Sequence, residues 1–150
     1  MANANSTLDV LQELIETCRD GETGYAHAAG IAANPELKAY FTERSQERHR
    51  FLKELQELAQ RSGEARPDTS GSVAGTLRRA WFEAKVDVGL GDQAILNSVE
   101  SGEDAAKRAY EKALASPLTE QAQNIIQRQA ESVFDAHDQV RDLRDREKAA

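Results

Sequence analysis

Apolar residues recur at steps of three and four positions along four stretches of the chain, the spacing expected of helices that bury one face. The predicted helices span residues 8–33, 35–61, 93–115 and 119–144. Each apolar stripe is interrupted once by a side chain that can bind a metal, and the four interruptions are Glu22, His49, Glu103 and His137. A buried carboxylate or imidazole needs a hydrogen-bond partner, an opposite charge or a metal, so these are the candidate functional residues.

The connections between the helices predict how they are arranged. Pro35 and Pro117 follow the first and third helices, and the residue before a proline is pushed away from helical geometry. The resulting short turns make antiparallel hairpins. Residues 63–92 form a long connection, and an apolar pattern over residues 73–88 predicts a short extra helix within it. A crossover of this length makes the second and third helices parallel, so we expect an all-α four-helix bundle.

The length and composition fit one helical domain. The chain has 150 residues, of which 39% are hydrophobic and 30% are charged. This is enough apolar material for one packed core and too much for a disordered chain. We expect the bundle to occupy residues 7–144, with disordered tails at residues 1–6 and 145–150.

Charge and cysteine content weigh against several classes of protein. The net charge of −7 opposes nucleic-acid binding, which normally requires a basic face. No apolar run approaches the roughly 20 residues of a membrane-spanning helix, so membrane insertion is not expected. Cys18 is the single cysteine, so no intrachain disulfide can form, and the predicted location is the cytoplasm. A homodimer is a further hypothesis, although every apolar stripe already has a use inside the monomer.

Glutamate and histidine side chains that face one another inside a bundle could hold a metal ion. Carboxylate oxygen and imidazole nitrogen together suit iron, manganese or zinc. Counted from the turn at Pro35, Glu22 and His49 differ in height by only ~4–5 Å at the helical rise of ~1.5 Å per residue. The alternative is free of metal, because a buried glutamate and histidine can satisfy each other.

The second glutamate–histidine pair fits less well. Counted from the turn at residue 117, Glu103 and His137 differ in height by roughly 10 Å. Glu100 lies one turn earlier than Glu103 and fits better. Gln46 lies one turn before His49, so Glu100 and Gln46 are candidate helper ligands.

Three other residues on the apolar stripes have simpler interpretations. Tyr25 and Tyr110 lie near Glu22 and Glu103 in the sequence, where each phenol could donate a hydrogen bond to the carboxylate or pack in the core. Cys18 is predicted to be a small buried core residue rather than a reactive thiol.

Four short segments carry a resemblance to a known superfamily. Residues 19–25 (RDGETGY) and 101–104 (SGED) resemble the stretches around a metal-binding glutamate in ferritin-like proteins. Residues 46–49 (QERH) and 134–137 (FDAH) stand where these proteins have Glu-x-x-His. With its helix pattern and crossover, the chain resembles the ferritin-like superfamily over about residues 8–143, and rubrerythrin-like bundles in particular. It is most similar to a bacterial family of ferritin-like four-helix bundles described as a domain of unknown function.

The resemblance implies a di-metal centre, and the chain departs from it at two positions. In di-iron members the glutamate of each Glu-x-x-His bridges the two metals, and here those positions are Gln46 and Phe134. Two negative charges that would offset the cations are missing. The expected function is therefore that of a non-enzymatic protein with a degenerate di-metal site, related to stress or to interactions. The alternative is a metal-binding protein or redox enzyme with one divalent ion (iron, zinc or manganese), whose ligands would be Glu22, His49, Glu103 and His137, with Gln46 or Glu100 as helper.

Overall fold

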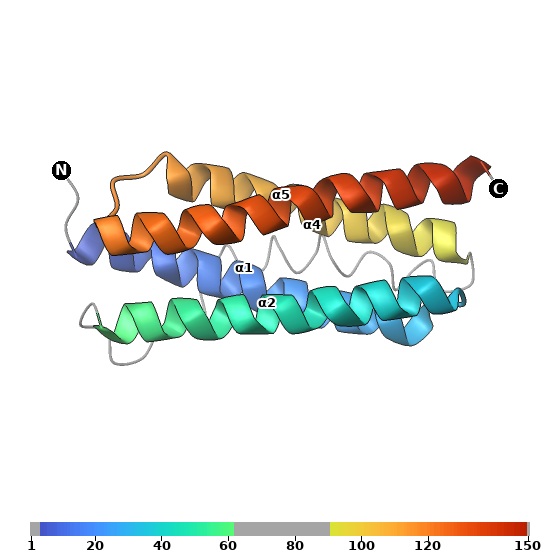
Figure 1. The fold of residues 1–150 in the computed structure, drawn as a ribbon, viewed down its shortest axis with the longest axis horizontal. Helices are drawn as coiled ribbons and strands as arrows, with labels where there is room; N and C mark the ends of the chain where they lie inside the picture. The colour runs from blue at the N-terminus through green and yellow to red at the C-terminus, as the bar shows by residue number, and fades with distance from the viewer. Residues whose placement is uncertain (1–3, 62–90, 150) are drawn as a thin grey trace.

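Four α-helices make up the described part of the protein. The computed structural model describes residues 4–61 and 91–149. Its helices are α1 (Ala4–Ile31), α2 (Pro35–Arg61), α4 (Asp92–Leu114) and α5 (Glu120–Ala149). The described residues contain no strand, and the helices lie side by side along one long axis (Figure 1). The predicted all-α four-helix bundle is confirmed.

The order of the helices produces two hairpins that pack together. α1 packs antiparallel to α2, and α4 packs antiparallel to α5 (Figure 1). α2 ends at the same end of the bundle at which α1 begins, whereas α4 begins at the opposite end (Figure 1). α2 and α4 therefore run parallel, as the long connection predicted. The extra helix predicted over residues 73–88 lies outside the described residues.

The helix bounds agree with the sequence pattern at the proline turns and differ at the ends of the chain. α2 begins at Pro35 and ends at Arg61, as predicted. α1 begins at Ala4 and α5 continues to Ala149, so both helices enter segments that the pattern assigned to tails. Near the start of α1, the Thr7 hydroxyl is buried and accepts the backbone N–H of Thr119 at 3.2 Å.

Two local features stabilise the end of α5, and the apolar periodicity takes no account of them. Leu143 packs against a core cluster beyond the last residue of the stripe, Val140. Arg146 and Lys148 lie in the last turn, where positive charge interacts favourably with the helix dipole. The helix therefore runs past the predicted end at residue 144.

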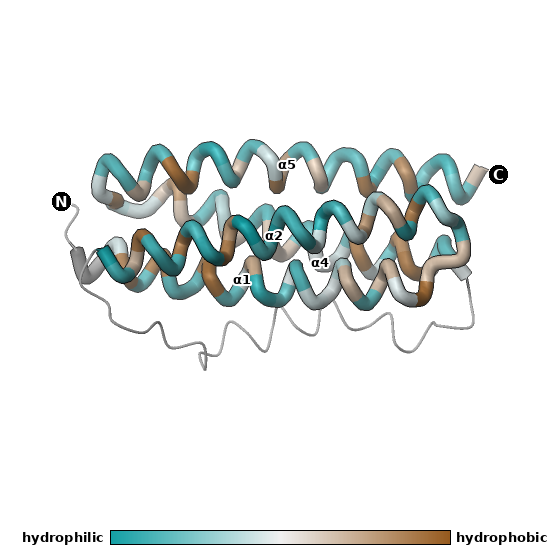
Figure 2. Tube along the Cα trace, turned by 60° about the horizontal axis from the view of Figure 1, so that its bottom comes forward, coloured by the Kyte–Doolittle hydropathy of each residue, from teal (hydrophilic) through white to brown (hydrophobic). Residues whose placement is uncertain are grey.

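The apolar core consists of two clusters that follow each other along the bundle. Figure 2 shows apolar positions recurring along all four helices between polar ones. The first cluster takes residues from 11–18 of α1, 51–59 of α2, 106–113 of α4 and 122–133 of α5. The second takes residues from 25–32, 37–41, 95–99 and Val140. On every helix the boundary falls at the predicted interruption, so Glu22, His49, Glu103 and His137 all lie in the stretches between the two clusters.

The connection between α4 and α5 removes the height mismatch expected for the second hairpin. α5 begins beyond the point where α4 ends, so the chain between Leu114 and Glu120 runs along the bundle axis (Figure 1). His137 is thereby brought level with Asp104, which is adjacent to Glu103, and the two side chains are hydrogen-bonded. The predicted offset of roughly 10 Å was wrong because it assumed a turn across the end of the bundle.

Candidate functional site

A set of polar side chains, here called the polar layer, lies between the two apolar clusters and at the edge of the second one. Its members are Glu22, Tyr25, Arg48, His49, Glu103, Asp104 and His137. They come from all four helices, with two neighbouring pairs, Arg48-His49 on α2 and Glu103-Asp104 on α4. Within each pair the first residue is buried and the second faces the surface.

A buried ion pair lies at the centre of the polar layer. Arg48 Nη2 donates to Glu103 Oε1 at 2.6 Å and to Glu103 Oε2 at 2.7 Å. The two side chains are 1% and 0% exposed. Tyr25 Oη donates to Glu103 Oε2 at 2.8 Å, and the Arg48 guanidinium lies 5.5 Å from the centroid of the Tyr25 ring. Both carboxylate oxygens of Glu103 are thus occupied by donors from two other helices.

Burial and charge shift the pKa values of Arg48 and Tyr25. Burial alone would lower the pKa of Arg48, but the adjacent Glu103 carboxylate raises that pKa above its usual value, so the guanidinium stays charged. Burial raises the pKa of Tyr25 well above its usual value, and the negative charge of Glu103 raises it further. Tyr25 therefore keeps its proton and remains a hydrogen-bond donor to Glu103.

The two histidines of the polar layer form interhelical pairs nearer the surface. His49 Nδ1 lies 3.0 Å from Glu22 Oε2 and links α2 to α1, with the two side chains 49% and 32% exposed. His137 Nε2 lies 2.6 Å from Asp104 Oδ1 and links α5 to α4. The other ring nitrogen of His137 lies 3.2 Å from Asp138 Oδ1. Each hairpin therefore carries one histidine–carboxylate pair across its two helices.

Of the predicted site residues, the structure pairs Glu22 with His49 but gives Glu103 and His137 other partners, Arg48 and Asp104. Glu103 is the inward carboxylate of α4, whereas Glu100 pairs with Arg144 on α5. The expectation that His49 interrupts the buried face was wrong, because Arg48 occupies the interior at this level and turns His49 towards solvent. Glu22, the partner of His49, also lies near the surface.

Arg48 is the buried member of the polar layer that the sequence pattern missed. The α2 stripe can be followed from Ser45 to Leu52 through either Arg48 or His49, because both routes use steps of three and four residues. Because arginine is rarely buried unless it is paired, the sequence alone favours His49 as the residue that faces the core. Glu103, which belongs to the other hairpin, supplies the opposite charge that allows Arg48 to be buried in place of His49.

A di-metal centre does not fit these residues. Glu103 is engaged by a guanidinium and a phenol rather than left free for a cation. Gln46 is exposed, and Phe134 has no ligand atom. Among the residues that the structure describes, no three His, Cys, Asp or Glu side chains converge in a group able to hold a metal. Binding of one divalent ion by Glu22, His49, Glu103 and His137, with Gln46 or Glu100 as helper, stays a prediction.

A second group of buried polar side chains forms a series of hydrogen bonds beside the cluster of Tyr25, Arg48 and Glu103. Cys18 Sγ and Tyr110 Oη are 3.1 Å apart, and Tyr110 donates to Gln129 Oε1 at 2.7 Å. Because the single proton of Tyr110 goes to Gln129, the Cys18 thiol is the donor to Tyr110. Gln129 Nε2 then donates to Glu54 at 2.8 Å, which brings the chain to the surface of α2.

These contacts settle the interpretations of the three stripe residues. Cys18 is fully buried, as predicted, and burial raises the pKa of its thiol to about 11. Tyr25 donates to Glu103 and not to the nearby Glu22. Tyr110 bonds to Gln129 rather than to Glu103. Both tyrosines are fully buried in the apolar clusters, so the predicted core packing is confirmed, while their hydrogen-bond acceptors come from other helices.

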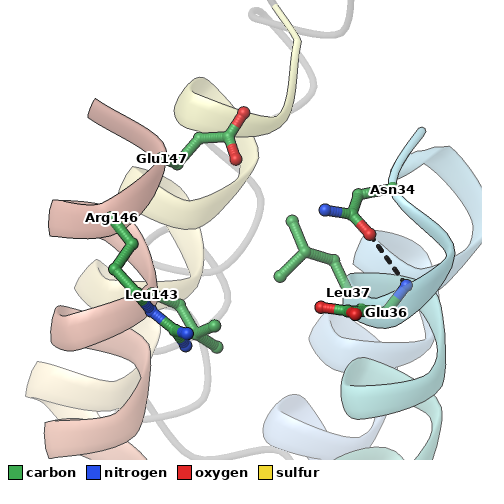
Figure 3. Close-up of a pocket in the computed structure, with 6 residues that line it drawn as sticks. All are labelled: Asn34, Glu36, Leu37, Leu143, Arg146 and Glu147. Atoms are coloured by element: carbon green, nitrogen blue, oxygen red, sulfur yellow. Dashed lines mark hydrogen bonds between the residues drawn. The ribbon is translucent and has the colours of Figure 1, made fainter. Parts of the chain in front are cut away.

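Two of the open depressions on the described surface lie beside the outer polar layer and at the start of α2. One, of about 390 Å³, is lined by Glu22, Ser45, Gln46, His49 and Arg50, beside the outer part of the polar layer. The other, of about 140 Å³, lies between the start of α2 and the end of α5 (Figure 3) and is lined by Asn34, Glu36, Leu37, Leu143, Arg146 and Glu147. In it the Asn34 side-chain oxygen accepts the Glu36 backbone N–H at 2.8 Å, which caps α2. This second depression shares no residue with the polar layer.

Comparison with protein families matches residues 6–116 to the family described as domain of unknown function DUF2383. The chain belongs to the DUF2383 family. The matched region includes α2 and α4, and therefore both members of the Arg48–Glu103 pair. No curated protein matches the chain. The ferritin-like superfamily stays a resemblance for this DUF2383 protein. None of the described helices is long and apolar enough to cross a membrane.

Proposed function

We propose that this DUF2383 protein is a non-enzymatic, ferritin-like bundle in which a buried arginine takes the place of a metal centre. It acts through interactions with other proteins, in a stress-related role. The observation that carries the proposal is the contact of the Arg48 guanidinium with both oxygens of Glu103, at 2.6 and 2.7 Å, inside the bundle.

The charge of the polar layer supports this proposal. Gln46 and Phe134 replace two carboxylates that would offset metal cations in the superfamily that the chain resembles. Arg48 adds a permanent positive charge beside Glu103, the remaining inward carboxylate on α4. All three residues reduce the negative charge that could hold a cation at this level of the bundle. A cation placed at this level would face Arg48 without a free counter-charge.

The surface half of the polar layer supports a second candidate, a protein that binds one divalent ion. Glu22 and His49 are paired beside Gln46 at the edge of an open groove. Glu22 holds Nδ1 of His49, which leaves Nε2 as the available ring nitrogen, and metal-binding histidines are commonly held in this way by a carboxylate. Iron, zinc or manganese would suit these donor atoms.

Elemental analysis separates the two candidates. Untagged protein would be purified without chelator and titrated with iron, zinc and manganese, with metal content and melting temperature recorded together. The proposal predicts no stoichiometric metal and a melting temperature that neither metal nor chelator shifts. About one ion per chain, lost in the double variant His49→Ala/His137→Ala, would instead establish the metal-binding candidate. Stoichiometric oxidation of ferrous iron would also overturn the non-enzymatic proposal.

Self-association is the first interaction to measure. Sedimentation of the full chain across a range of concentrations distinguishes a monomer from a homodimer, which is one hypothesis for this chain. A homodimer would direct the search for partners towards surfaces left open after pairing. A monomer at all concentrations would remove the homodimer from the proposal.

A further inference from the structure

The two histidines of the polar layer differ in how many of their ring nitrogens are engaged. Nδ1 of His49 lies 3.0 Å from Glu22 Oε2, and Nε2 makes no hydrogen bond or ion pair with any described residue. His137 has a carboxylate oxygen within reach of each nitrogen, from Asp104 at 2.6 Å and from Asp138 at 3.2 Å. Of these two rings, that of His49 alone therefore presents a nitrogen to an incoming reactant.

The carboxylate of Glu22 determines which nitrogen of His49 is reactive. An ionised carboxylate only accepts hydrogen bonds, so the ring proton lies on Nδ1, on the side of Glu22. Nε2 of the neutral ring then keeps its lone pair. A carboxylate in this position orients the imidazole and stabilises the positive charge that the ring gains when the other nitrogen reacts.

The surface around His49 leaves room for a reaction partner. The open depression of about 390 Å³ is lined by Glu22, Ser45, Gln46, His49 and Arg50. His49 lies in the middle of α2, which holds its backbone rigidly, and its side chain is 49% exposed. The Ser45 hydroxyl donates to the backbone oxygen of Glu22 at 2.8 Å, so its proton is already engaged. The nucleophile of this depression is therefore the imidazole.

The neighbours of His49 favour a phosphoryl group as the group that it accepts. A bound phosphoryl group carries nearly two negative charges and three strong acceptor oxygens. Arg50 lines the same depression and makes no ion pair with the described residues, and Gln46 adds an amide donor. The sequence has no glycine-rich phosphate-binding loop, so the phosphoryl group must come from another molecule rather than from a nucleotide held by this chain.

We propose that His49 is a phosphoryl-acceptor site, modified at Nε2 by an activated phosphoryl group that a partner protein carries on nitrogen or on a carboxylate oxygen. The lone pair of Nε2 forms the bond to phosphorus, while the bond from phosphorus to the donor atom breaks and leaves its electron pair on that atom. The proton on Nδ1 stays on the ring, where Glu22 balances the new positive charge. Arg50 and Gln46 hold the phosphoryl oxygens. This inference goes beyond the proposed function and does not depend on it.

The experiment exposes the full chain to phosphoramidate or to acetyl phosphate, with N-acetylhistidine in the same solution as a reference. EDTA is present, so that a metal ion at Nε2 cannot block the reaction. Phosphorus-31 NMR and mass spectrometry then locate the phosphoryl group.

The expected result is phosphorylation of His49 at Nε2, faster than that of N-acetylhistidine and roughly tenfold above that of His137, whose nitrogens are both engaged. Reaction with phosphoramidate alone indicates a nitrogen-linked donor, and reaction with acetyl phosphate indicates an acyl phosphate. No label at His49 from either donor, or label that forms no faster than on N-acetylhistidine, would overturn the proposal.

Variants separate the roles of the ring and the carboxylate. His49→Gln should abolish the label. His27→Gln is the matched control and should keep it, because Nε2 of His27 is buried and this residue does not line the depression. Glu22→Gln removes the charge but keeps an acceptor, so the rate should fall roughly tenfold while the melting temperature stays close to wild type. Glu22→Ala also exposes Nδ1, so both isomers of phosphohistidine should form. An unchanged rate and a single isomer in both Glu22 variants would contradict the positioning role of Glu22.

Discussion

Arg48 and His49 are consecutive residues of α2, and each pairs with a carboxylate on another helix. Arg48 and Glu103 are 1% and 0% exposed, whereas His49 and Glu22 are 49% and 32% exposed. A step of one residue turns a side chain by about 100° around a helix. That rotation separates a pair in the dry interior from a pair in water.

The two environments give the two pairs different energetic roles. In the interior, the interaction between charges is strong, and so is the penalty for leaving one of them alone. At the surface, water and salt screen the attraction, and flexible side chains lose entropy when they pair. The inner pair should therefore behave as an indivisible unit, while the outer pair should be nearly dispensable.

Arg48→Met tests this difference most strongly. The substitution leaves Glu103 buried beside a methyl group, and we expect a loss of about 3–5 kcal/mol in the free energy of unfolding. Urea denaturation followed by circular dichroism measures it. Arg50→Met, the exposed control on the same helix, should stay within about 0.5 kcal/mol of wild type.

A second substitution shows whether that loss comes from the unpaired charge. Adding Glu103→Leu to Arg48→Met removes the stranded carboxylate, so most of the lost stability should return. A double variant as unstable as Arg48→Met alone would mean that packing around the arginine stem, rather than charge, dominates at this position.

High pH should destabilise the interior polar groups. The pKa of Cys18 is raised from its ordinary value of 9.0 to about 11 by burial. Well below pH 9 the thiol is protonated in both states, and as the pH rises through 9 the unfolded chain loses the proton first. Stability therefore falls between pH 9 and 11, by up to about 3 kcal/mol, since each pKa unit corresponds to about 1.4 kcal/mol.

The contribution of Cys18 is isolated by comparing urea midpoints of wild type and Cys18→Ala across this pH range. The variant should lose less stability than wild type as the pH rises. Equal slopes would assign the alkaline loss to Tyr25 and Tyr110, whose pKa values are also raised by burial.

Two glycines of α1 extend the comparison to the backbone. Gly21 faces Arg48, and a methyl group there would come within 2.8 Å of Nη1, whereas nothing lies within 4 Å of the same position at Gly30. Gly21→Ala should cost about 1–3 kcal/mol through overpacking. Gly30→Ala should gain up to about 1 kcal/mol from the better helix propensity of alanine. Equal effects in denaturation experiments would show that the guanidinium moves aside freely.

Local signals in the sequence account for much of the fold. The proline turns and the apolar periodicity predicted four helices, and Pro35 placed the start of α2 at the residue where the structure has it. The long connection predicted that α2 and α4 run parallel. The same pattern singled out Glu22, His49, Glu103 and His137, which the structure places at one level of the bundle. The count from the turn at residue 117 had instead offset Glu103 and His137 by roughly 10 Å.

The pairing inside that level depends on contacts between helices, which the sequence alone did not supply. Arg48 and Glu103 come from different hairpins, 55 positions apart in the chain. Helical periodicity fixes which side of α2 faces inward only to within about one residue, so it could not choose between Arg48 and His49. The choice is made by the partner across the core, since a buried arginine is acceptable only opposite a carboxylate.

His49→Ala should have the smallest effect of the series. It removes a half-exposed ring and leaves Glu22 able to turn into water, so the loss should be below about 1 kcal/mol. Raising the salt concentration should shrink this loss, because the pair is screened. The loss in Arg48→Met should hardly respond to salt, since water and ions do not reach Glu103. Suppose instead that His49→Ala lowers the free energy of unfolding by a large amount that does not depend on salt. The outer pair would then share the buried environment of the inner pair, and the distinction between the two pairs would be wrong.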